Sequence, residues 1–522
     1  MAFLPFWFPM LHSSITHQAQ TAPLSPSRRW LILAIVSAAL LLIVVDMTVL
    51  YTALPRLTHD LQASASDKLW IVNSYALVVS GLLLGMGTLG DRLGHKRLFL
   101  SGLATFGLAS IAAAYSPNPT ALIAARAFLG VAAAMMMPAT LSLIRITFHD
   151  ERERAVAFGV WSSIASGGAA FGPVLGGFLL EHFWWGSVFL INVPIVLIAL
   201  PLGWLLVPRS TPDTSRPWDI KGSLLIMVGL VASTLAIKEM GKLHINWSLT
   251  AIALLTGIAF LSWFVRQQNR SPFPLLDFSL FKDSTLSTAV LAALTASAAL
   301  IGMELVFSQR LQLVLGFSPL EAGMAILPLP LAAFVAGPLA GRLLVVIGSK
   351  YLLMGALSLA GAGMATYLLW HNSAQFLQVI SLVMLGLGVG AAMTAASSTI
   401  MQSVPPSRAG MVASVEEMSY ELGGALGVTI MGSLLSFVYS ASLILPQNLS
   451  GRVQAYDSLD QALLMAETMP QDLALTLSEL ARDSFDKGYV AVLASCTVLL
   501  LLAALAVWYF QRNKPSQTSY SH

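Results

Sequence analysis

The sequence predicts an all-α polytopic membrane protein. Of its 522 residues, 56% are hydrophobic and only 10% are charged, and the mean hydropathy is +0.76. Apolar runs of about 18 to 25 residues, long enough for a helix to cross a bilayer, recur along the whole chain. This combination is typical of a protein that spans the membrane many times.

The apolar runs predict fourteen membrane-spanning helices. The expected spans are 30–53, 69–89, 98–115, 119–144, 155–180, 185–207, 219–238, 247–266, 284–307, 320–340, 350–370, 375–402, 411–438 and 487–510. An even number of spans puts both termini on one side. The loops on that side hold nineteen of the 28 Lys and Arg residues and the opposite loops hold eight, with Arg126 inside a span. By the positive-inside rule, both termini are expected in the cytoplasm.

Short motifs recur eight spans apart, which indicates two related halves. The run Gly87 to Arg97 after the second span resembles Gly337 to Lys350 after the tenth, and glycine-rich runs pair span 4 with 12 and span 5 with 13. Parallel six-helix halves are one plan of secondary transporters, with the substrate site between the halves. A 6+2+6 arrangement is therefore expected: a cytoplasmic tail (1–28), a first bundle (29–207), an inserted pair with linkers (208–283), a second bundle (284–510) and a cytoplasmic tail (511–522).

The thirteenth span carries three acids, Glu416, Glu417 and Glu421. A carboxylate at bilayer depth is costly, so such residues normally face a bundle interior or a water-filled cavity. Glu417 and Glu421 share a helix face because they are four residues apart. No Lys or Arg lies in this span, so we interpret it as a proton and cation site, with Glu417 expected to carry the proton and Glu421 to attract a second charge. The alternative is that the acids only accept hydrogen bonds from buried donors.

Three further charged residues lie inside other spans. Asp46, preceded by apolar residues in the first span, is a candidate second proton or cation site, or else an interfacial residue that reaches toward the outside. Arg126 is the one basic residue at depth, and it can either help to couple proton movement or organise buried carbonyl groups. Glu304 near the outer end of the ninth span is a weaker candidate for the same site.

Two glycine-containing motifs are expected to serve conformational change. In the turn after the second span, glycines allow a tight bend, an acid can accept from a neighbouring helix N-terminus or Arg, and basic residues hold the cytoplasmic face. We interpret it as a charge latch that biases two states; its residues are Gly87, Asp91, Arg92, Gly94, Lys96 and Arg97. The fifth span has a small-residue face and a kink that favour close helix packing, formed by Gly168, Gly172, Pro173, Gly176 and Gly177.

The connection 439–486, between the last two spans, is far longer and more acidic than the other connections. It is either a solvated acidic loop or a cap that attracts cations over the outer exit. A stretch such as 459–467 could form a short amphipathic helix.

Several other classes of protein lack support. Cys496 is the only cysteine, which excludes a disulfide framework and a cysteine metal site. The sequence contains no HExxH motif. It also lacks a Walker A loop, because the run with the right glycine spacing has Asp91 where the phosphate-binding lysine would be required. The net charge of +3 gives no argument for nucleic acid. We therefore expect no enzyme activity, metal or cofactor.

Taken together, these motifs resemble those of the major facilitator superfamily. The runs GDRLGHKR, RAFLGVAAAMMMPA, GPVLGG and VDMTVLYTALP are similar to its signature motifs. Fourteen spans, INVP at 191–194 and VEEMSYELGG at 415–424 are similar to its QacA-like drug–proton antiporter branch, and within it to pumps of the SmvA type. The resemblance covers about residues 28 to 510. It implies proton-coupled export of mono- and divalent lipophilic cations, such as quaternary ammonium biocides, dyes and methyl viologen, across a bacterial inner membrane.

The resemblance also implies that Asp46 and the three acids of the thirteenth span take part in coupling. Small organic cations, protons and membrane lipid are then the expected partners, and a monomer is the expected state. Two other functions are open on the sequence alone: an exporter of a native cationic metabolite such as a polyamine or an amino acid, and a membrane sensor that does not transport.

Overall fold

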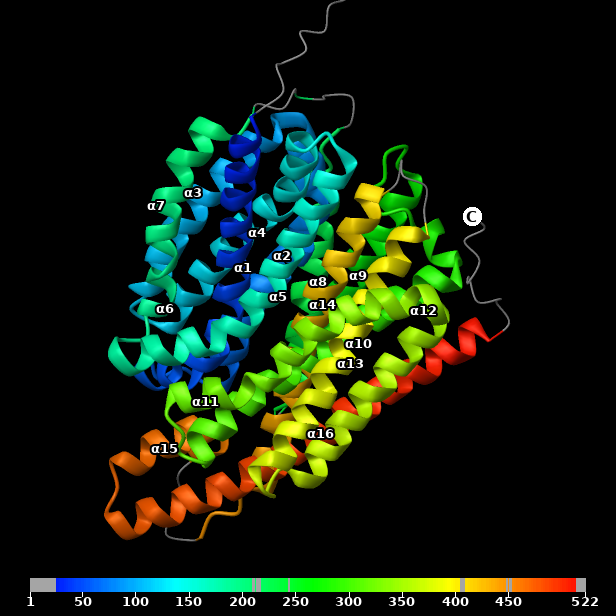
Figure 1. Ribbon diagram of the computed structural model, residues 1–522. Helices are drawn as coiled ribbons and strands as arrows, with labels where there is room; N and C mark the ends of the chain where they lie inside the picture. The colour runs from blue at the N-terminus through cyan, green and yellow to red at the C-terminus, as the bar shows by residue number, and fades with distance from the viewer. Residues whose placement is uncertain are drawn as a thin grey trace, which may run out of the picture.

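The computed structural model describes residues 25–208, 212, 217–242, 245–403, 409–446, 449 and 453–512, and this part of the chain is built from helices (Figure 1). The first helices are α1 (Pro26–Asp60), α2 (Ala65–Leu93), α3 (His95–Ala114), α4 (Pro119–Thr147), α5 (Glu151–His182), α6 (Ser187–Leu190) and α7 (Asn192–Leu206). The expected tails, 1–28 and 511–522, lie almost entirely outside the described residues.

Two helices follow and lead into a second group. The pair is α8 (Ile220–Met240) and α9 (Trp247–Arg270). After the 3₁₀ turn η1 (Phe278–Lys282) come α10 (Ser284–Gln309), the π-helical η2 (Arg310–Val314), α11 (Pro319–Ile326), α12 (Pro328–Trp370), α13 (Gln375–Gln402), α14 (Ala409–Ser442), the 3₁₀ turn η5 (Val453–Tyr456), α15 (Leu459–Glu467) and α16 (Gln471–Gln511).

Within the described residues, twelve helices are long and apolar enough to cross a membrane. One of the twelve covers 52 residues, from Pro319 to Trp370. At Gly348 inside it, φ is +78° and the backbone is not helical. Only glycine adopts this conformation readily, so two helices meet at that residue. The prediction of an all-helical multi-pass protein is confirmed, while the predicted number of fourteen spans exceeds these twelve.

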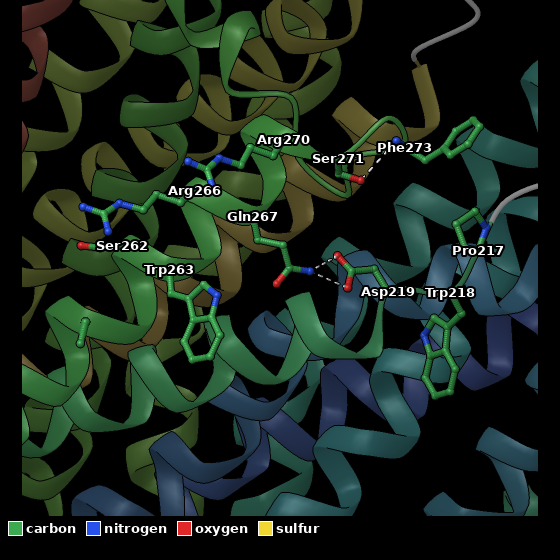
Figure 2. Close-up of a pocket in the computed structure, with 11 residues that line it drawn as sticks. Pro217, Trp218, Asp219, Ser262, Trp263, Arg266, Gln267, Arg270, Ser271 and Phe273 are labelled. Atoms are coloured by element: carbon green, nitrogen blue, oxygen red, sulfur yellow. Dashed lines mark hydrogen bonds between the residues drawn. The ribbon is translucent and has the colours of Figure 1, made fainter.

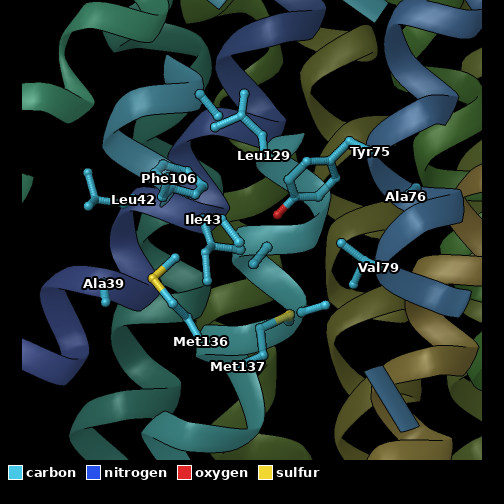
Figure 3. Close-up of a cluster of buried hydrophobic side chains, with 14 of the residues drawn as sticks. Ala39, Leu42, Ile43, Tyr75, Ala76, Val79, Phe106, Leu129, Met136 and Met137 are labelled. Carbon is cyan, nitrogen blue, oxygen red and sulfur yellow. The ribbon is translucent and has the colours of Figure 1, made fainter. Parts of the chain in front are cut away.

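Buried apolar side chains form two large clusters, one in each group of helices. The first is centred on α1 to α4 and the second on α10 to α16. Figure 3 shows part of the first, where Ile43 of α1, Phe106 of α3 and Leu129 of α4 gather in the core. Helix α8 packs against α2 and α14, and α9 packs against α8. Each group of helices therefore has its own packed apolar core.

Residues 439–486 were expected to form one long connection, and that prediction is wrong in detail. Helix α14 continues to Ser442, α15 occupies Leu459–Glu467, and α16 already begins at Gln471, well before the expected start at residue 487. The predicted short helix at 459–467 is confirmed. In Figure 1, α15 lies at the end of the molecule opposite to that at which α1 begins. We call these the cap end and the terminal end, and we call residues 453–486 the cap.

The cap is tied to the first group of helices by a buried ion pair. Asp460 of α15 pairs with Lys68 of α2, and both side chains are almost completely buried. Thr58 of α1 donates to the same carboxylate at 3.1 Å, and Lys68 also donates to Gln309 of α10 at 2.9 Å. At the edge of the cap, exposed Glu467 pairs with His59 at 3.1 Å. The acidic residues of this connection therefore include contacts that hold the two groups together.

We predict that Asp460→Asn destabilises the protein far more than Glu467→Gln. The first change leaves the Lys68 ammonium buried without its counter-charge, which costs about 3 to 5 kcal/mol. The second removes a solvent-exposed pair worth less than about 1 kcal/mol. Thermal unfolding of the purified variants, followed by tryptophan fluorescence, measures the difference. Equal unfolding midpoints for the two variants would contradict a stabilising role for the buried pair.

Candidate functional site

A buried ion pair joins the first and fourth helices. Asp46 of α1 and Arg126 of α4 are 1% and 2% exposed, and Arg126 Nη1 contacts Asp46 Oδ2. Asn192 of α7 donates to the other carboxylate oxygen at 3.3 Å, and Arg126 Nε donates to the carbonyl of Ile71 at 3.3 Å. Asp46 is therefore neither interfacial nor alone, because its partner lies eighty residues further along the chain.

The pair is supported by residues that the sequence analysis missed. Asn192 also donates to Ser110 Oγ of α3 at 3.2 Å, and the guanidinium of Arg126 lies 4.7 Å from the ring centroid of Tyr75. A cation over an aromatic face is stabilised by the ring quadrupole, and more strongly so when both are desolvated. Asn192 and Ser110 are polar residues within apolar runs, and that signal could have identified them.

Glu421 of α14 lies across from this pair, on the other group of helices. Arg126, Tyr75 and Glu421 line one small cavity of about 20 Å³ between α1, α2, α4, α10 and α14. A cavity of this size holds roughly one water molecule. Glu421 is 6% exposed, and its Oε2 has no hydrogen-bond partner among the described residues. A buried acceptor in that state favours an added proton or a cation.

The three acids of α14 do not share one environment. Glu416 and Glu417 are half-buried, whereas Glu421 is buried. The hydroxyl of Tyr420 lies 3.5 Å from Glu416 Oε1 and donates to the carbonyl of Met393 on α13 at 3.2 Å. Glu416 is thus directed to the α13 side, and the cavity beside Arg126 is lined by Glu421 alone of the three.

Glu304 of α10 is half-buried and lies one turn beyond Ile301 of the same helix. Ile301 lines the cavity that contains Glu421 and Arg126, whereas Glu304 does not. Glu304 therefore belongs to the surroundings of the site, one helical turn away from the cavity itself.

The turn between α2 and α3 has the tight geometry expected from its sequence. Gly94 has a φ of +91°, which glycine adopts readily. Asp91 pairs with His95 one turn away at 3.2 Å, in place of the expected helix N-terminus or Arg, and its side chain is 45% exposed. Lys96 donates to the carbonyls of Trp204 and Val207 at the end of α7, at 2.6 and 2.7 Å. Arg97 is exposed, and Gly87 and Arg92 are half-buried.

The small residues of α5 lie against two different helices. Side chains of α1 fill the space where Cβ atoms would be at Gly168, Gly172 and Gly176. A Cβ at Gly177 would lie 2.5 Å from the carbonyl oxygen of Pro319 at the start of α11, and Pro173 approaches Gly323 of α11 in the same way. This face of α5 therefore permits close contact with the second group of helices at the cap end.

The two ends of the molecule differ. At the cap end, Gln312 donates to the carbonyl of Thr52 at 3.0 Å and Ser318 donates to Glu181 at 2.6 Å, which joins the groups. At the terminal end, α1 and α5 border an open, largely apolar groove of about 600 Å³, which begins at Trp30 and reaches Gly168. Contacts between the two groups thus close the cap end, whereas the groove at the terminal end is lined by the first group alone.

Comparison with known proteins agrees with this architecture. The model of the Major Facilitator Superfamily matches residues 36–428. The methyl viologen resistance protein SmvA of Salmonella typhimurium is 39% identical over 485 residues, which are 92% of this chain and 98% of that protein. The multidrug efflux pump LfrA of Mycolicibacterium smegmatis is 39% identical over 486 residues, with 92% and 96% covered.

Solved structures show the same fold at low sequence identity. A bacterial homologue of the human lysosomal transporter Spinster, in an inward-facing and unoccupied conformation, has a TM-score of 0.62 at 17% identity and covers 93% of this chain and 99% of that one. The nucleoside transporter NupG has a TM-score of 0.58 at 12% identity, with 92% and 99% covered.

The family match and the efflux relatives identify a multi-pass membrane transporter and not an enzyme. The chain belongs to the Major Facilitator Superfamily. The resemblance inferred from the signature motifs is therefore confirmed at the level of the superfamily, and its efflux relatives agree with the antiporter branch.

Proposed function

We propose that this chain is a proton-coupled antiporter that exports lipophilic mono- and divalent organic cations across the bacterial inner membrane. The observation that carries the proposal is the buried Glu421 carboxylate, which shares a cavity with the Asp46–Arg126 pair of the other group. Relatives named for methyl viologen resistance and multidrug efflux support the substrate class of quaternary ammonium biocides, dyes and viologens.

The proposed topology has fourteen crossings in a 6+2+6 arrangement. It adds α5 to the twelve spans and divides the helix 319–370 at Gly348. The domain boundaries then follow those expected from the sequence, with α8 and α9 as the inserted pair. The excess of Lys and Arg in the loops at the terminal end supports a cytoplasmic location for both termini. The cap would then lie on the outer side.

Charge balance in the cavity explains why a proton and a drug would compete. Arg126 already neutralises Asp46, so Glu421 is the carboxylate left without a counter-charge. An uncompensated charge at this depth costs several kcal/mol. Glu421 is therefore stable when it is protonated or when an organic cation lies beside it. Since both ligands relieve the same charge, each lowers the affinity of the other, which is sufficient for exchange.

In this conformation the protein is closed on the proposed outer side. The outer end is closed by the cap, by α11 against α5 and by the Lys68–Asp460 pair. A cavity of about 20 Å³ beside Glu421 is far too small for a drug, whose sites usually measure roughly 300 to 1,000 Å³. The groups must therefore move apart before a drug reaches Glu421. The turn with Asp91 and the glycine face of α5 are the proposed conformational elements.

We predict that Arg126→Ala abolishes transport while the protein remains in the membrane. Asp46 would be left buried without a counter-charge and would take up a proton permanently, so the cluster could no longer respond to Glu421. Ethidium efflux from cells, normalised to the amount of protein in the membrane, should fall below about a tenth of the wild-type rate. Arg145→Ala, at an exposed site on the same helix, is the matched control. Efflux near the wild-type rate in Arg126→Ala would refute the coupling role.

We propose the opposite assignment of Glu417 and Glu421 to the one expected from the sequence, because Glu421 lines the cavity beside Arg126 and Glu417 does not. We predict that Glu421→Gln abolishes the release of protons when drug is added to the solubilised protein. Glu417→Gln should keep that release with ethidium and weaken it mainly with a dication such as methyl viologen, because a second charge needs a second carboxylate. Both variants keep side-chain size, and each is the control for the other. Proton release by Glu421→Gln at the wild-type level would exclude Glu421 as the coupling acid.

A further inference from the structure

The pair α8 and α9 carries a polar groove that the transport cycle does not use. The groove measures about 1110 Å³ and lies at the terminal end, between the residues before α8 and the last two turns of α9. Figure 2 shows Trp218 and Asp219 on one side and Trp263, Arg266 and Arg270 on the other. The site described above lies between other helices, so this groove is separate from it.

The acidic residue of the groove is fully engaged and leaves the arginines free. Asp219 accepts from the backbone N–H of Gly222 at 2.8 Å, from Gln267 Nε2 at 2.9 Å and from Gln268 Nε2 at 2.9 Å. These bonds fasten the start of α8 to the end of α9. Arg266 and Arg270 are exposed and have no ion-pair partner among the described residues. The carboxylate is thus used for structure, and two positive charges remain for a ligand.

The basic residues at the groove come from both helices of the pair. Arg266 and Arg270 are four residues apart and so project from the same face of α9, where Ser262 precedes them by a further turn. Lys221 of α8 approaches from the other helix, with its Nζ 4.9 Å from the centre of the Trp263 ring. Two exposed guanidinium groups on one helix face suit a phosphate, which arginine binds with two parallel hydrogen bonds, and the ammonium group of Lys221 adds positive charge beside them.

The location of the groove indicates what kind of phosphate could reach it. Most of α9 faces outward, with exposed apolar side chains that include Ile252, Leu255 and Ile258. These side chains continue directly into the groove along the helix. Trp263 is 50% exposed at the junction, as is typical of a tryptophan at the level of lipid headgroups. A ligand here would thus contact the apolar surface of α9 with one part and the cationic groups at the terminal end with another.

We propose that this groove binds the phosphate of an anionic phospholipid in the cytoplasmic leaflet. The acyl chains would lie along the apolar face of α9, and the headgroup would bind Arg266, Arg270 and Lys221. The assignment to that leaflet depends on the proposed orientation, whereas the binding chemistry does not. Basic grooves between membrane helices on the cytoplasmic side commonly select anionic headgroups.

Native mass spectrometry of the full-length protein tests the proposal. The protein is purified in detergent, mixed with phosphatidylglycerol or phosphatidylcholine, and the bound lipids are counted. Wild type should retain phosphatidylglycerol in clear preference to phosphatidylcholine. Each basic residue near an anionic membrane surface is worth about fivefold in binding, so Arg266→Gln/Arg270→Gln should weaken retention by about tenfold or more. Arg145→Gln/Arg512→Gln removes the same charge elsewhere and should bind as wild type does.

Two outcomes would overturn the proposal. Equal retention of phosphatidylglycerol by wild type and by Arg266→Gln/Arg270→Gln would show that the groove does not hold the lipid. Displacement of the lipid by millimolar inorganic phosphate would show a site for free anions in place of a lipid site. Ethidium exchange is measured separately on the same samples, so a failure of lipid binding is distinguishable from a failure of the transport proposal.

Discussion

The structure depends on the cost of holding charge inside a membrane protein. Asp46 and Arg126 are tolerated at depth because they neutralise each other. Asn192, which also donates to Ser110, donates to the second oxygen of the Asp46 carboxylate, and the Tyr75 ring stabilises the guanidinium of Arg126. Glu421 lines the same cavity from the other group of helices and has no such partner. In the proposed mechanism, this unbalanced carboxylate between the two groups makes their junction responsive to protons and cations. The pair at the cap end, Lys68 with Asp460, is balanced and holds the groups together.

The contacts between the two groups of helices differ between the two ends of the molecule. Close contacts at the cap end use small residues of α5 against α11 and buried polar links, whereas the terminal end has an open apolar groove beside α1. Interfaces of this kind switch between discrete arrangements and do not deform continuously. The proposed alternating access would require the two groups to separate at one end while they stay in contact at the other. Within the described residues, helix α9 packs chiefly against α8 and not against either group, which leaves its outer surface available for lipid.

Much of the fold followed from the sequence because hydropathy reports spans directly, since every backbone polar group in lipid must be satisfied within helices. The acids of α14 were identified because a carboxylate in an apolar run is conspicuous. The pairing of Asp46 with Arg126 was missed, since side chains eighty residues apart meet only after α1 and α4 pack. For the same reason Asp460 was considered part of a solvated loop or a cap, and its partner Lys68 was not foreseen. The distinct environments of Glu416, Glu417 and Glu421 depend on which neighbours each side of α14 meets.

We expect an inward proton gradient to drive organic cations out against their own gradient. Purified protein in liposomes with an acidic lumen and an alkaline exterior tests this most directly, with ethidium outside and DNA trapped inside as the reporter. Protons leaving the vesicle through an antiporter must be exchanged for ethidium entering it, so fluorescence should rise with the gradient and stop when a protonophore collapses it. Ethidium entry equal to that of protein-free vesicles, or unaffected by the protonophore, would contradict the account.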